Sequence, residues 1–198
     1  MPSSAATSVP SGNLLRRFRR NRSASAAIEF ALVAPVFFGL LFAIIETALM
    51  FFANQVLETI TQDSARMLMT GQAQSGQVGV CADPVSGAAL PCTQATFQNY
   101  VCSQIPALFT CNGPNGIFVD VEAYPTGFSS IAISSQIDAN KNFINNMQYN
   151  PGQPGEVVVV RLFYQWPQIV TGLGYNITNL TGNMRLLSAT AVFQNEPY

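Results

Sequence analysis

An apolar run near the N-terminus constrains this chain more than any other feature. Residues 30–45 carry no charge, and after Glu46 and Thr47 the apolar sequence resumes over residues 48–53. As a helix, residues 30–53 would extend about 36 Å, which is enough to cross a bilayer. A cleaved secretory signal would have an apolar segment of only about 7–15 residues. The run therefore predicts a transmembrane helix.

Charge is distributed unevenly around this run. Five of the nine basic residues lie directly before it: Arg16, Arg17, Arg19, Arg20 and Arg22. After Asn54 there are four basic residues and eight acidic ones, a net charge of −4. This asymmetry is typical of a single-pass protein with a cytoplasmic N-terminus. A nucleic-acid-binding arm would need aromatic platforms or a second basic patch, and the sequence has neither, so we expect no nucleic-acid partner.

The apolar pattern continues past the membrane span as an amphipathic helix. Apolar and small residues recur at spacings of three and four from Ala53 to Leu68, and Gly71 is suited to end the helix. We expect one helix from Ala26 to Thr70, followed by a flexible linker over residues 71–80. The predicted organisation has three parts: a basic cytoplasmic leader (1–24), a transmembrane and extended helix (25–71), and an extracytoplasmic head (72–198).

The head has the pattern of a small α+β domain. Residues 117–124 alternate in polarity, residues 156–166 form the strongest strand signal, and residues 185–194 form a third. A helix is predicted to begin at Thr93, and a helical turn at residues 140–147 within the long loop 125–155. These elements predict an antiparallel sheet of three or slightly more strands, packed against one or two helices.

All four cysteines, Cys81, Cys92, Cys102 and Cys111, follow the predicted membrane span. An even number of cysteines in an oxidising compartment favours disulfides over a zinc site, because none has the paired CxxC spacing of zinc ligands. Three pairings are possible. We favour Cys81–Cys92 with Cys102–Cys111, because each bond closes a short loop.

Catalysis is not expected. The chain lacks histidine, its one lysine is Lys141, and no serine lies in a nucleophile-elbow context. Asp120 and Glu122 lie on one face of a predicted strand, as the ordinary polar side of a sheet does. We therefore predict no enzymatic activity, no cofactor and no metal.

Two acidic residues interrupt the apolar sequence. A carboxylate within hydrocarbon costs about 2.5–3.5 kcal/mol on insertion scales, so each needs a partner or a route to water. Glu29 lies at the membrane edge, where it reaches lipid headgroups. If a peptidase cut between Ala24 and Ser25, Glu29 on a neighbouring copy would suit the freed amine. Glu46, about 25 Å further along the helix, would reach either water or a neighbouring helix.

Residues 16–36 (RRFRRNRSASAAIEFALVAPV) resemble the N-terminus of TadE-like proteins, pseudopilins of the Tad/Flp tight-adherence branch of type IV pili. Further likeness lies in Ile44-Ile45-Glu46, in residues 65–72 and in residues 193–197. In that family a prepilin peptidase cuts before such a segment, and an acid and an aromatic residue occupy mature positions five and six. The resemblance thus implies processing at Ala24–Ser25 and assembly roles for Glu29, Phe30 and Glu46. Ala24 departs from the family pattern, since prepilins generally carry glycine there.

The resemblance implies a minor pilin that helps to prime or cap an adhesive Tad-type pilus. Its partners would be the inner membrane, the prepilin peptidase, the major pilin, other minor pilins and the assembly platform. The head would lie in the bacterial periplasm, and on a cell-surface pilus after assembly. The alternative is a permanently anchored envelope protein whose head binds a ligand or partner protein, with Phe163, Tyr164 and Trp166 lining the site.

Overall fold

The computed structural model describes residues 22–76, 81, 88–105, 108–111, 113, 115–170 and 176–198. Most of the expected leader, residues 1–21, lies outside these ranges. The chain divides into two compact units, Met1–Ile44 and Ile45–Tyr198.

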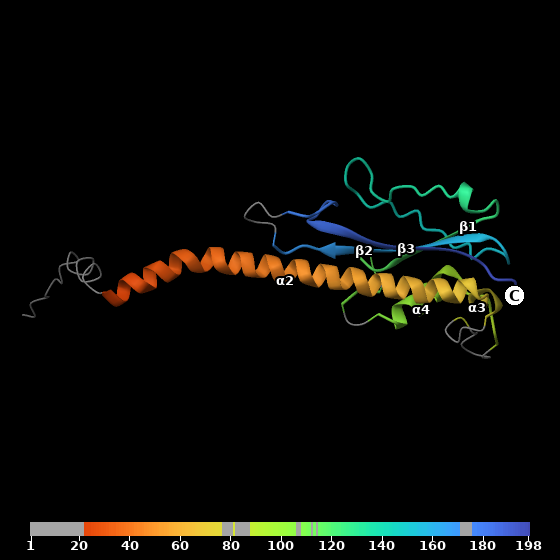
Figure 1. Cartoon of the computed structure of the whole chain (residues 1–198), viewed down its shortest axis with the longest axis horizontal. Coiled ribbons are helices and arrows are strands. Elements are labelled where there is room, and N and C mark those ends of the chain that lie inside the picture. Colours follow the sequence, from red (N-terminus) through yellow and green to blue (C-terminus); the bar gives the residue numbers. More distant parts are fainter. Residues whose placement is uncertain are drawn as a thin grey trace, which may run out of the picture. The chain divides into compact units, whose positions relative to one another are not determined.

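The longest element is helix α2, Arg22–Met69, which contains Pro35 (Figure 1). It ends where Gly71 takes a φ of 72°, a left-handed conformation that glycine adopts without steric cost. The ring of Tyr198 also occupies the space that a Cβ at residue 71 would need. The expected linker over residues 71–80 is wrong at its start, because a short helix α3, Gln72–Ser75, follows at once. Residues 77–80 lie outside the described part.

The head contains a three-stranded antiparallel sheet in the order β1-β2-β3. The strands are β1 (Phe118–Tyr124), β2 (Val157–Pro167) and β3 (Met184–Gln194), close to the predicted ranges. Four consecutive valines begin β2, and β-branched residues suit a strand buried on both faces. Pro167 ends it, since proline cannot donate to the ladder. The predicted α+β class is confirmed.

One face of the sheet packs on helices. The outer part of α2 and helix α4, Gln94–Ser103, share a core with alternate residues of the strands (Figure 1). The core side chains of these elements include Leu57, Ile60, Leu68, Phe97, Val101, Val119, Val121, Val158, Val160 and Leu162. Helix α4 has Thr93 as its N-cap, at the position where the helix was predicted to begin.

The other face of β1 and β2 is covered by the segment between these two strands. The rings of Phe118 and Phe163 pack on Phe143, with centroid distances of 4.7 and 6.1 Å. The described helix in this segment is the 3-10 helix η2, Phe128–Ser130. The predicted helical turn at residues 140–147 is wrong. The carboxylate of Asp138 instead accepts the backbone N–H groups of Asn140 and Asn142, which shapes a tight turn.

Candidate assembly site

The expected processing position lies near the start of the described part of α2. Ala24 and Ser25 both belong to Arg22–Met69, so the peptide bond between them is within helical backbone. Cleavage at this bond would therefore require the helix to open locally.

The inner part of α2 exposes apolar side chains on all its sides. Glu29 and Phe30 are both exposed, as are Leu32, Val33 and most of the large residues that follow. The most apolar stretch of Ala26–Met69 has a mean hydropathy of 2.5, and none of it is buried in the structure. This N-terminal apolar helix fits a single-pass membrane protein.

The outer part of α2 differs, because one stripe of it is buried in the head. The buried stripe consists of Met50, Ala53, Leu57, Ile60, Ser64 and Leu68, spaced by three and four residues. Glu46 continues the same stripe one turn before Met50.

Glu46 contacts the head of its own chain. Its two carboxylate oxygens accept the backbone N–H groups of Ile169, at 2.5 Å, and Val170, at 2.8 Å. These N–H groups follow the end of β2, where the ladder no longer supplies acceptors. The sequence left two possible partners for Glu46, water and a neighbouring helix. The carboxylate needs neither, because both of its oxygens already accept a hydrogen bond from the head. Its spacing from Met50 could have indicated which way it faces, although its partners lie too far along the chain to be predicted.

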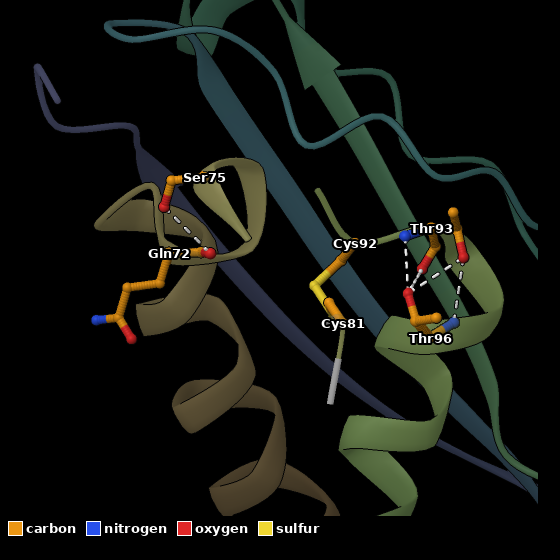
Figure 2. The surroundings of a disulfide bond; sticks show 6 residues. All are labelled: Gln72, Ser75, Cys81, Cys92, Thr93 and Thr96. Atoms are coloured by element: carbon orange, nitrogen blue, oxygen red, sulfur yellow. Dashed lines mark hydrogen bonds between the residues drawn. A yellow bond between two sulfur atoms is a disulfide. The ribbon is translucent and has the colours of Figure 1, made fainter. Parts of the chain in front are cut away.

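Both disulfides lie beside the ends of short helices. The structure pairs Cys81 with Cys92 and Cys102 with Cys111, with Cα–Cα distances of 5.0 and 5.6 Å. This is the favoured sequential pairing. Figure 2 shows Cys92 immediately before the capping box of α4, in which Thr93 and Thr96 each accept the other's backbone N–H. Cys92 also contacts α3, because its backbone N–H donates to the Ala73 carbonyl at 2.8 Å.

A buried ion pair lies on the face of the sheet that the segment between β1 and β2 covers. Arg161 lies directly opposite Asp120 in the β1–β2 register and donates to it through Nε and Nη2, at 2.9 and 2.7 Å. Nη2 also reaches Glu122 at 2.9 Å, and Nη1 donates to the Ser134 carbonyl. The sequence analysis missed this network. A single arginine in an otherwise apolar strand, with two acids in the neighbouring strand, was the signal.

Several pKa values in the head reflect these surroundings. Burial raises the pKa of Asp120, while the Gln148 N–H and the Arg161 guanidinium oppose that rise. The Asn142 backbone and side-chain N–H groups lower the pKa of Asp138. Burial raises the pKa of the Tyr149 hydroxyl well above its ordinary value. Asp120 and Asp138 hold the loop in place through the backbone N–H groups that they accept.

The two outlying stretches of family-like sequence meet at the end of α2. The Glu196 N–H donates to the Met69 carbonyl at 2.9 Å, and the Asn195 amide donates to the carbonyls of Pro151 and Gln153. Residues 65–72 and 193–197 thus form one structural junction. This junction satisfies a helix-end carbonyl that would otherwise lack a partner.

The aromatic residues considered for a binding site belong to the core. Phe163 and Tyr164 are both buried, on opposite faces of β2. Trp166 packs against Phe109 and Tyr164 at centroid distances of 6.4 and 6.2 Å. They therefore do not line one site. Among the described residues, no group of three or more His, Cys, Asp or Glu side chains could hold a metal.

Comparison with known proteins gives one match. No curated protein and no solved structure matches the chain. The model of the TadE-like protein family matches residues 24–66, which comprise most of α2. This match over α2 supports a TadE-like protein, and the TadE-like family implies involvement in the Tad pilus system.

Proposed function

We propose that this protein is a minor pilin, or pseudopilin, that takes part in priming, assembling or capping a Tad-type pilus. The observation that carries the proposal is the exposed apolar surface of α2 within the family-matched segment. In the membrane this surface contacts lipid, and in a pilus it packs against other pilin helices. The head is presented outside the inner membrane, with the N-terminus in the cytoplasm.

Shearing of surface fibres tests this function. The protein should be recovered in sheared fibres together with the major pilin, and it should be lost from that fraction when the assembly platform is deleted. A permanently anchored envelope protein would instead stay wholly in the membrane fraction of piliated cells. That distribution would contradict the proposal.

Processing by a prepilin peptidase is the second part of the proposal. The Ala24–Ser25 bond lies near the start of the described part of α2, and cleavage there would remove the basic leader. The intact mass of the membrane-extracted protein should correspond to a chain that starts at Ser25. A mass that includes residues 1–24 in cells with active peptidase would exclude processing. Ala24→Gly is the matched variant and should be processed at least as fast.

The third part of the proposal concerns Glu29. After cleavage before Ser25, Glu29 would be the fifth residue of the mature chain. Within the apolar core of a pilus, its carboxylate would be the partner of the free amine of a neighbouring subunit. Glu29→Ala should insert into membranes normally but should give few or no fibres that contain this protein. Normal recovery of the variant in sheared fibres would remove this role from Glu29.

A further inference from the structure

Ile169 is the most exposed large apolar side chain in the described part of the chain, at 88%. It lies in the turn Gln168–Val170 that follows β2. The Gln168 N–H donates to the Asn183 carbonyl, while the next two N–H groups are held by Glu46. The turn therefore has a fixed backbone and an apolar side chain that the protein leaves uncovered.

The residues around Glu46 show which level of α2 the turn Gln168–Val170 lies beside. Phe51 and Phe52 are exposed at 64% and 57%, and polar side chains then begin with Asn54, Gln55 and Glu58. At a rise of about 1.5 Å per residue, Phe52 lies about 9 Å beyond Glu46 along the helix. The turn bound to the Glu46 carboxylate thus lies within the apolar band of α2.

We propose that the turn Gln168–Val170 is a membrane anchor, in which Ile169 inserts into the acyl chains of the leaflet on the side of the head. Glu46 holds the turn at this depth. The occupant of the exposed surface is lipid, because the surface continues the apolar band of the spanning helix beside it. The arrangement also explains the second acid of the span. The two backbone N–H groups compensate the Glu46 charge at a depth where water is scarce.

The inference rests on membrane anchoring through α2 and not on the pilus role. The test therefore uses the purified full-length protein in phosphatidylethanolamine–phosphatidylglycerol vesicles, without any pilin. Ile169→Cys carries an environment-sensitive fluorophore, and the four native cysteines are protected as disulfides. Phe51→Cys is the reference for lipid exposure. Thr190→Cys, at an exposed position of β3 beside the polar residues Glu58 and Gln62, is the reference for water exposure.

Lipids that carry a quencher on their acyl chains should quench the label at position 169 as strongly as the label at position 51, and severalfold more than the label at position 190. Aqueous iodide should give the reverse order. A label at position 169 that iodide quenches as it does at position 190, or that neither quencher reaches, would overturn the proposal.

Glu46→Gln tests the role of the carboxylate, because glutamine keeps one acceptor and replaces the other by a donor. Acyl-chain quenching at position 169 should fall severalfold, while the protein still floats with vesicles. Unchanged quenching in this variant would overturn the role of Glu46. Loss of flotation by the unsubstituted protein would overturn anchoring itself, and thereby the inference, independently of any pilus experiment.

Discussion

The two parts of α2 differ in both composition and surroundings. Within Met1–Ile44 the helix exposes its large apolar residues on every side, whereas from Met50 onward a stripe of it belongs to the core of the head. Both parts carry large apolar residues, so the presence of such residues alone does not identify what a helix packs against. The outer part already has its partner within the chain. The inner part has to find lipid or another protein.

The comparison implies that the stability of the head does not depend on the inner part of α2. Among substitutions in the head, the largest loss of stability should come from breaking the buried ion pair between Asp120 and Arg161. Asp120→Ala leaves the Arg161 guanidinium without its main partner in a buried site. We expect a loss of about 3–5 kcal/mol in the free energy of unfolding. Urea titration in mild detergent, followed by fluorescence of Trp166, the single tryptophan, measures it. Glu122→Ala should cost less, because Glu122 is 24% exposed. Equal losses would contradict this assignment.

Leu57→Ala compares the two parts of α2 directly. Leu57 is fully buried in the core of the head, so its truncation should destabilise the head by about 2–5 kcal/mol. Phe37→Ala removes a larger side chain from the inner part, where it is exposed. In the same urea titration the second variant should stay within about 0.5 kcal/mol of the parent. Comparable losses in both variants would show that the inner part also supports the head.

Removal of one disulfide should have an intermediate effect. Cys102 and Cys111 are separated by nine positions. The chain-entropy model gives about 2–3 kcal/mol for a loop of this size. Replacement of both cysteines by serine should lower the urea midpoint of unfolding accordingly. A double variant as stable as the parent would show that the bond does not constrain the unfolded head.

The smallest effect should come from the capping box of α4. Thr93→Ala removes the acceptor of the Thr96 N–H and should cost about 1 kcal/mol. Thr93→Ser keeps the hydroxyl and is the matched control, which should be close to the parent. Hydrogen exchange at the N–H groups of the first turn of α4 would localise the change. If both variants protect that turn as the parent does, the cap is not important for stability.

Much of this fold follows from local patterns. The valine run of β2, the alternation in β1 and the start of α4 at Thr93 depend on neighbouring residues, and all three elements were predicted close to their observed positions. The contacts that hold distant parts together were not predicted. Glu46 meets Ile169 and Val170, and Arg161 meets Asp120, across long stretches of chain. The segment 125–155 was also misjudged in part, because its turn at Asp138 depends on side-chain hydrogen bonds rather than on periodicity.

The central claim is that the inner part of α2 is an assembly surface. A photoactivatable benzophenone amino acid at Phe37, an exposed residue of that part, tests it most directly in piliated cells. Gln55, exposed beyond the apolar band, is the control position. We predict that illumination links Phe37 to another pilin and that the adduct disappears when the assembly platform is deleted. Adducts with lipid alone at Phe37, in cells that assemble pili normally, would contradict the account.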